Sequence, residues 1–136
     1  MEPREVARKF VERINEHDVD GLSALMTDDH RFIDALGESG TGREELRRGW
    51  EGYFALVPDY RIDIEEVFSD GPVVVLLGTA RGTYGPEGSR RVEDAWLVPA
   101  AWRARVTEGR VAEWRVYVDN DPLRRRIAAH GPQAEA

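Results

Sequence analysis

The sequence predicts an α+β fold in which three N-terminal helices pack against a curved, mainly antiparallel sheet. Up to Pro58, apolar residues recur at helical spacing, and from Tyr60 onward they alternate with charged residues as they do in strands. A run of helices followed by a run of consecutive strands is typical of an α+β domain. We expect the helices to lie on one face of the sheet and to leave a conical pocket between the two layers.

The first helix begins near Pro3 and repeats Val6, Phe10 and Ile14 every four residues, which predicts one buried face. A break then leads to a short second helix. Asp18 is its expected N-cap, because a carboxylate at that position accepts hydrogen bonds from the first turn.

A short apolar strand over 30–34 separates the second helix from the third. The glycine-rich stretch 37–42 follows it. That stretch lacks the lysine and hydroxyl residues of a phosphate-binding loop, so it predicts a simple turn. The third helix ends at Pro58, and its apolar face consists of Leu46, Trp50, Tyr53, Phe54 and Val57.

The C-terminal half contains four longer strands, predicted from alternation over 60–65, 73–84, 91–106 and 110–118. Pro99 is expected to break the third of these strands, because proline cannot donate to a sheet ladder. A short helix over 121–127 and a polar tail over 129–136 complete the chain. We therefore predict a single domain over 1–128.

Composition excludes several classes of protein. The absence of cysteine removes disulfides and thiol nucleophiles, and three scattered histidines give no metal-binding spacing. A net charge of −7 argues against a nucleic-acid partner. No apolar run is long enough to cross a membrane and no secretion signal is visible, so we expect a cytoplasmic protein without membrane contact, metal or cofactor.

Asp34, at the end of the first strand, is the main catalytic candidate. A carboxylate in an apolar wall is costly unless it has a function, and alternation directs Asp34 to the same side as Phe32. An apolar surround would make Asp34 a better proton acceptor near neutral pH. The alternative is a strand-end acid that caps the next turn. His30 lies on the same strand face and is a candidate acid/base partner, with a solvent-exposed histidine as the favoured alternative.

Two parts of the chain resemble the nuclear transport factor 2-like superfamily, the cone-shaped α+β fold of ketosteroid isomerases, limonene epoxide hydrolases and SnoaL-like polyketide cyclases. The first part comprises residues 10–15, 18–22, 24–26, 28–29 and 32–37. The second is Gly109-Arg110-Val111, followed by Trp114-Arg115-Val116-Tyr117 and Asp119. The resemblance covers nearly the whole chain.

The resemblance implies that Asp34 matches the general base of the isomerases and that Asp119 matches the acid late on the last strand of SnoaL-like proteins. Other positions depart from these patterns. Phe10 and Trp50 stand where the isomerases have the tyrosine of the oxyanion site and its supporting tyrosine, and Val116 stands where epoxide hydrolases have an acid. Tyr53, Tyr84 and Tyr117 are the phenols considered as replacement donors.

The leading hypothesis is a cofactor-free enzyme of the isomerase or cyclase type, acting on a small apolar carbonyl or polyketide-like molecule. An epoxide hydrolase is less favoured, and a non-catalytic ligand-binding or interaction module is the alternative. The resemblance also implies a homodimer formed through sheet surfaces. The residues expected to contact the substrate are Phe10, Ile14, Phe32, Trp50, Tyr53, Phe54, Trp102, Trp114, Val116 and Tyr117.

Overall fold

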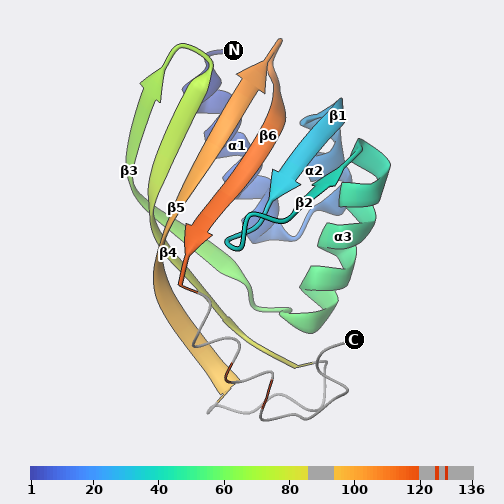
Figure 1. The fold of residues 1–136 in the computed structure, drawn as a ribbon, viewed down its shortest axis with the longest axis vertical. Helices are drawn as coiled ribbons and strands as arrows, with labels where there is room; N and C mark the ends of the chain where they lie inside the picture. Colours follow the sequence, from blue (N-terminus) through green and yellow to red (C-terminus); the bar gives the residue numbers. More distant parts are fainter. Residues whose placement is uncertain (86–93, 120–124, 126–127, 129–136) are drawn as a thin grey trace.

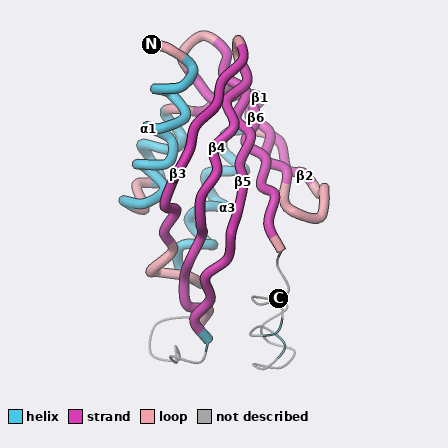
Figure 2. The backbone as a smooth tube through the Cα atoms, turned by 90° about the vertical axis from the view of Figure 1, so that its left-hand side faces the viewer, coloured by secondary structure: helices cyan, strands magenta, loops and turns pink. Residues whose placement is uncertain are grey.

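The computed structural model describes residues 1–85, 94–119, 125 and 128. Its elements are α1 (Pro3–Glu16), α2 (Val19–Ala24), β1 (Met26–Ile33), β2 (Ser39–Thr41), α3 (Arg43–Leu56), β3 (Arg61–Asp70), β4 (Val73–Thr83), β5 (Ala95–Thr107) and β6 (Arg110–Val118). The helices lie against one face of a curved sheet, here called the inner face (Figures 1 and 2). This arrangement confirms the predicted α+β class. The helix and tail predicted over 121–136 lie outside the described residues, apart from positions 125 and 128.

The described strands form a six-stranded sheet in the order β2-β1-β6-β5-β4-β3. Neighbouring strands are antiparallel, except that β1 runs parallel to β6. The long strands β3 to β6 follow one another in both sequence and space, as the predicted meander requires. No helix in the described part of the chain is long and apolar enough to span a membrane.

Helix α1 packs the predicted stripe against the sheet: Val6, Phe10 and Ile14 are all 0% exposed. The helix ends at His17, which adopts a left-handed conformation with φ of 55°. The predicted N-cap of α2 is confirmed, because the Asp18 carboxylate accepts a hydrogen bond of 2.8 Å from the backbone N–H of Gly21. The start of α2 is therefore where its sequence predicts it.

The glycine-rich stretch after β1 contains more structure than the predicted turn. Strand β2 folds back onto β1, with Ile33 opposite Ser39 and Arg31 opposite Thr41. The prediction of a turn alone is wrong, because these residues complete a hairpin that extends the edge of the sheet. Asp34 follows β1 at the start of the connection.

Strand β5 continues through Pro99, so the predicted break is wrong. Pro99 lies opposite Thr79 of β4, and the last described pairing between β5 and β6 joins Ala100 to Val118. Beyond that pairing, the described β5 residues have a neighbouring strand on one side only. A proline without an N–H is tolerated at such an edge position.

Candidate functional site

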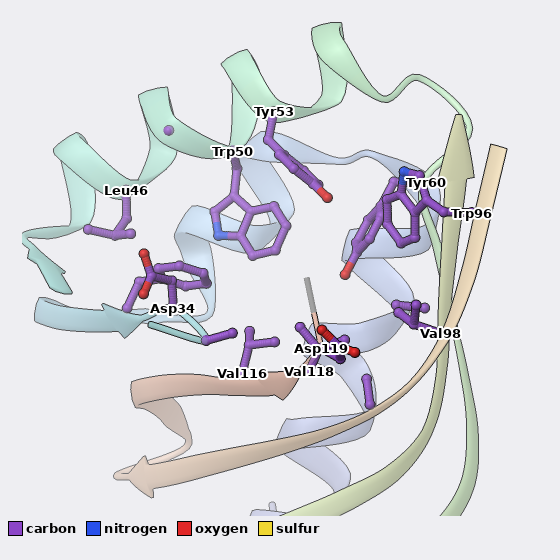
Figure 3. Close-up of a pocket in the computed structure, with 15 residues that line it drawn as sticks. Asp34, Leu46, Trp50, Tyr53, Tyr60, Trp96, Val98, Val116, Val118 and Asp119 are labelled. Atoms are coloured by element: carbon purple, nitrogen blue, oxygen red, sulfur yellow. The ribbon is translucent and has the colours of Figure 1, made fainter. Parts of the chain in front are cut away.

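A cavity of about 330 Å³ lies between α3 and one end of the inner sheet face (Figure 3). Helix α3 provides Leu46, Gly49, Trp50 and Tyr53, and the end of β1 with its connection provides Phe32, Asp34 and Ala35. The remaining walls come from the sheet and the residues next to it: Tyr60, Ala80, Trp96, Val98, Ala100, Val116, Val118 and Asp119. This lining is mostly apolar, so the cavity suits a small apolar molecule.

Five of the lining residues form a continuous row of aromatic rings, here called the aromatic wall. Its ring centroids are separated by 6.0 Å from Phe32 to Trp50, 6.2 Å from Trp50 to Tyr53, 5.0 Å from Tyr53 to Tyr60, and 6.0 Å from Tyr60 to Trp96. The first three pairs meet edge to face, which is a favourable arrangement for aromatic rings. The wall therefore offers a preformed surface to a flat apolar ligand.

Two ion pairs tie the N-terminal end of helix α3 to neighbouring elements. Arg43 pairs with Asp28 of β1 at 2.7 Å, and Arg47 pairs with Asp20 of α2. Both aspartates are exposed, so each pair contributes little to stability. Their effect is geometric: they hold the helix beside β1, with Trp50 directed at the cavity (Figure 3).

The Asp34 carboxylate caps a turn and also borders the cavity. Its Oδ1 atom accepts hydrogen bonds from the backbone N–H groups of Leu36 and Glu38, each at 2.9 Å, so the side chain caps the turn after β1. Asp34 also lines the cavity. Its Oδ2 atom has no hydrogen-bond partner among the described residues. The turn thus holds one oxygen and leaves the other available for a ligand.

Asp119 directly follows β6 and lines the cavity beside Val118 (Figure 3). Its side chain is exposed, in contrast to the half-buried Asp34. The described site therefore has two acids of different exposure, and its lining includes no arginine, lysine or histidine among the described residues.

His30 does not join Asp34 in the cavity. It is 0% exposed, so the expectation of a solvent-exposed histidine is wrong. Nδ1 donates a hydrogen bond of 2.6 Å to the carbonyl oxygen of Val111, and the ring packs 5.8 Å from that of Phe10. Burial lowers the pKa of His30, which favours the neutral ring. The space around it is filled by α1, so the structure gives His30 a core position.

Four of the predicted contact residues line the cavity: Phe32, Trp50, Tyr53 and Val116. The other six do not, and the structure corrects their placement. Phe10, Ile14, Trp102 and Trp114 are at most 1% exposed and pack in the core under α1. Phe54 stacks on His17, with ring centroids 4.2 Å apart. Tyr117 is 44% exposed and lies opposite Ala101 in the β5–β6 ladder.

Tyr60 and Trp96 are cavity residues that the sequence analysis did not propose. Tyr60 lies two residues before Ile62, which is buried on the inner face. Alternation along the strand therefore indicates that the Tyr60 side chain is on the inner face as well. Trp96 likewise alternates with Val98 and Ala100. Their placement beside a cavity could not be predicted, because alternation identifies a face of the sheet and does not locate empty space above it.

The phenol groups of Tyr53 and Tyr60 are neutral polar groups in the half of the aromatic wall that is farther from Asp34. Burial raises the pKa of both hydroxyls, and the neighbouring Tyr53 raises the pKa of Tyr60 further. Both phenols are therefore protonated near neutral pH. In the described part of the chain, no group of three histidine, aspartate or glutamate side chains is arranged to hold a metal ion.

The model of the SnoaL-like domain family matches residues 7–114. A proposed SnoaL-like polyketide cyclase from Shewanella denitrificans has 18% identity and a TM-score of 0.79, with 93% of this chain and 97% of that chain covered. An LEH-like epoxide hydrolase from M. tuberculosis has 19% identity and a TM-score of 0.76, with 94% and 93% covered.

A protein from Catenulispora acidiphila with a ketosteroid isomerase-like fold, solved in complex with trimethylamine, has 19% identity and a TM-score of 0.77. The match covers 97% of this chain and 96% of that chain. No curated protein matches the sequence. At these identities the solved structures establish a shared fold, and the residues of this cavity must carry any argument about its chemistry.

Proposed function

This chain belongs to the SnoaL-like domain family, and we propose that it is a cofactor-independent enzyme of the isomerase or cyclase type with Asp34 as its general base. The fold family includes polyketide cyclases, ketosteroid isomerases and epoxide hydrolases. The substrate is a small, mostly apolar carbonyl or polyketide-like molecule. The apolar lining of the cavity and its aromatic wall support this class of substrate.

One observation carries the proposal: the Asp34 carboxylate lines the cavity with Oδ1 held by two backbone N–H groups and Oδ2 without a partner among the described residues. A general base must be held in place and must keep a lone pair for the proton that it removes. The turn after β1 meets both requirements. Its hydrogen bonds orient the carboxylate before any substrate binds.

In the proposed reaction, Oδ2 of Asp34 takes a proton from a carbon that is next to the substrate carbonyl or conjugated with it. The electron pair of the broken C–H bond moves into the carbonyl system and gives an enolate. Return of the proton from Asp34 to another carbon gives an isomer. Alternatively, the enolate carbon attacks a second carbonyl of the same molecule and closes a ring, and the alkoxide formed from that carbonyl takes the proton back from Asp34. Neither route consumes an oxidant, a reductant or a second substrate.

The test uses hydrogen–deuterium exchange at carbon, because exchange reports proton removal even when the natural substrate is unknown. We expect the wild-type protein to accelerate exchange in a panel of apolar ketones in D₂O, followed by NMR. In Asp34→Asn, the side-chain amide oxygen still accepts the two turn hydrogen bonds but the base is lost. The accelerated exchange should fall by about 10²-fold or more.

Glu38→Gln is the matched control, because it neutralises an exposed acid in the same turn. It should exchange at the wild-type rate. Wild-type exchange in Asp34→Asn would rule out Asp34 as the base.

A non-catalytic binding module is the second candidate function, favoured by the apolar residue Val116 in a cavity wall where epoxide hydrolases are expected to carry an acid. In that case Asp34→Asn and the wild type would bind the same apolar ligand with equal affinity, and neither would promote exchange. Native mass spectrometry of the purified protein separates the two candidates by identifying any retained molecule.

The proposal includes a homodimer formed through the outer sheet face, opposite the helices. Leu97 of β5 is 65% exposed and Phe68 of β3 is 54% exposed. Leu97 alternates with the buried Trp96 and Val98, so its side chain points away from the helices. A second copy of the chain would cover these exposed apolar groups.

A further inference from the structure

The cavity contains two phenol groups from different elements that converge. Tyr53 lies on α3, Tyr60 immediately precedes β3, and their rings meet edge to face at a centroid distance of 5.0 Å and an angle of 82°. Figure 3 shows both hydroxyl groups directed into the cavity, away from the backbone of their own elements. Two O–H donors therefore face the same space.

Neither hydroxyl has a hydrogen-bond partner among the described residues. The side chains of Tyr53 and Tyr60 make ring contacts, and neither hydroxyl oxygen is among the buried side-chain atoms that lack a partner, so both are open to the cavity. Burial also raises the pKa of both phenols, so each retains its proton and remains a donor. A ligand oxygen in the cavity would supply the missing acceptor.

The position of Tyr60 is fixed from behind by α1. Nε2 of His17 donates a hydrogen bond of 2.9 Å to the carbonyl oxygen of Tyr60. Asn15 binds both backbone groups of Ile62: its amide donates to the carbonyl at 2.9 Å, and its oxygen accepts from the N–H at 2.8 Å. These contacts hold the start of β3 against α1. The phenol is thus preorganised, as an electrostatic stabilising group should be.

From this geometry we propose that the hydroxyls of Tyr53 and Tyr60 bind the carbonyl oxygen of the substrate. The proposal rests on the proposed function and replaces the donors that the resemblance led us to expect at the positions of Phe10 and Trp50. Phe10 is buried in the core, and the indole nitrogen of Trp50 lies toward the Asp34 end of the cavity (Figure 3). The hydroxyls of Tyr53 and Tyr60 would therefore contact the end of the ligand that lies away from Asp34.

The arrangement also narrows the class of substrate. Asp34 and Tyr60 lie at opposite ends of the cavity, with Trp50 between them (Figure 3). When Asp34 removes a proton at one end, the electron pair released from the C–H bond must reach the oxygen held at the other end. Only a conjugated system carries it there. The substrate is therefore an apolar conjugated carbonyl compound, such as an extended enone with a removable C–H proton at the far end of its conjugated system, that lies along the aromatic wall.

Two probes test the phenol pair without knowledge of the substrate. 2-Acetylnaphthalene is a flat conjugated ketone whose oxygen only accepts hydrogen bonds, and 2-ethylnaphthalene lacks that oxygen. We expect the wild-type protein to bind the ketone more tightly than the hydrocarbon in fluorescence titrations. Tyr60→Phe and Tyr53→Phe should each weaken binding of the ketone by about three- to tenfold, since each removes one neutral hydrogen bond. Binding of 2-ethylnaphthalene should not change.

Tyr117→Phe is the matched control, because it removes the same hydroxyl from an exposed tyrosine outside the cavity lining. Circular dichroism establishes that each variant is folded, and the retained affinity for 2-ethylnaphthalene establishes that the cavity is intact. Equal affinity of the wild type and both cavity variants for the ketone would overturn the proposal. So would failure of the wild type to bind either probe.

Asp34→Asn distinguishes this inference from the proposed function. Proton exchange in that variant tests the base, whereas ketone binding in the tyrosine variants tests the phenols. Loss of proton exchange in Asp34→Asn with unchanged ketone binding in the tyrosine variants would reject only the phenol pair. Wild-type exchange in Asp34→Asn with weakened binding in the tyrosine variants would reject only the general base.

Discussion

Buried residues alternate in the same way in the two halves of the inner sheet face, but one half packs against a helix and the other borders a cavity. Under α1 the face is filled: Phe10 packs 4.7 Å from Trp114, and Trp102 is 1% exposed. Toward the other end, Trp96 and Val98 belong to the same strand and the same face as Trp102, yet they line a cavity. We refer to these regions as the filled half and the open half.

The difference lies in what stands opposite the sheet. In the filled half, α1 lies directly on β3 to β6 and inserts its apolar stripe. Beyond the end of α1, the opposite wall is α3, which contacts α2, β1 and β2 instead. Aromatic residues on α3 and the sheet then face each other across empty space. The sheet is therefore packed against a helix at one end and borders a cavity at the other.

The sharpest contrast should be in the free energy of unfolding. Phe10→Ala removes a fully buried ring from the filled half and should cost about 3–5 kcal/mol. Phe32→Ala, in the open half, removes a half-buried ring that already borders a cavity, and it should cost clearly less. Urea denaturation of both variants measures the difference. Equal losses would show that the two halves contribute equally to stability.

The filled half should also make stability depend on pH through His30. An unfolded histidine has a pKa near 6.5, and burial lowers the pKa of His30 in the folded protein. Protons then bind the unfolded state more readily. The contribution of the neutral His30 ring to the free energy of unfolding is fully present above about pH 6.5. It is lost as the pH falls toward the folded pKa, by up to about 1.4 kcal/mol per pH unit.

Urea titrations between about pH 5 and 7.5 measure this slope. His30→Asn is the control, because an amide nitrogen can donate to the Val111 carbonyl oxygen but does not titrate. That variant should have a lower stability at every pH and a flatter profile. An unchanged slope in His30→Asn would assign the pH dependence to other groups.

A larger side chain in the open half should reduce ligand affinity more than it changes the free energy of unfolding. Ala100→Leu places a larger side chain in the cavity that Ala100 lines. Because empty space is present there, the change in unfolding free energy should stay within about 1 kcal/mol, whereas added volume in a well-packed core costs more. Binding of 2-acetylnaphthalene should be lost. Ala104→Leu, the same change on the same strand in the filled half, should be destabilising.

The two halves also differ in how far the sequence predicts them. The stripe on α1 and the alternation on β5 correctly predict that Phe10, Trp102 and Trp114 face inward. They do not predict which inward-facing residues pack against a helix and which border a cavity. A period of two gives the face of a strand but carries no information on the distance to the opposite layer. The predicted contact residues are therefore divided between the two halves: Phe32, Trp50, Tyr53 and Val116 border the cavity, and Phe10, Trp102 and Trp114 pack in the filled half.

Asp34 was predictable because a single acid at the end of an apolar strand stands out against its surroundings. Its two roles were both anticipated, as turn cap and as cavity residue, and the two oxygens of one carboxylate separate them. Tyr60 was overlooked because a tyrosine at the start of a strand is ordinary. Its significance depends on Tyr53, seven residues earlier on a helix, and that contact is created by the tertiary fold.

The outer face of the sheet should have the smallest effect on stability and a distinct effect on assembly. Leu97→Asp places a charge on a residue that is 65% exposed, so the unfolding free energy of the chain itself should change by no more than about 0.5 kcal/mol. If the proposed dimer forms through this face, two like charges would meet near the interface and the protein should become monomeric. Light scattering coupled to size-exclusion chromatography measures the mass of each species.

Leu36→Asp, in the connection between β1 and β2, is the control, because Leu36 is 59% exposed and lies outside the outer sheet face. A dimer that persists in Leu97→Asp would reject this part of the face as the interface and would leave the cavity arguments intact, because they depend only on residues of one chain.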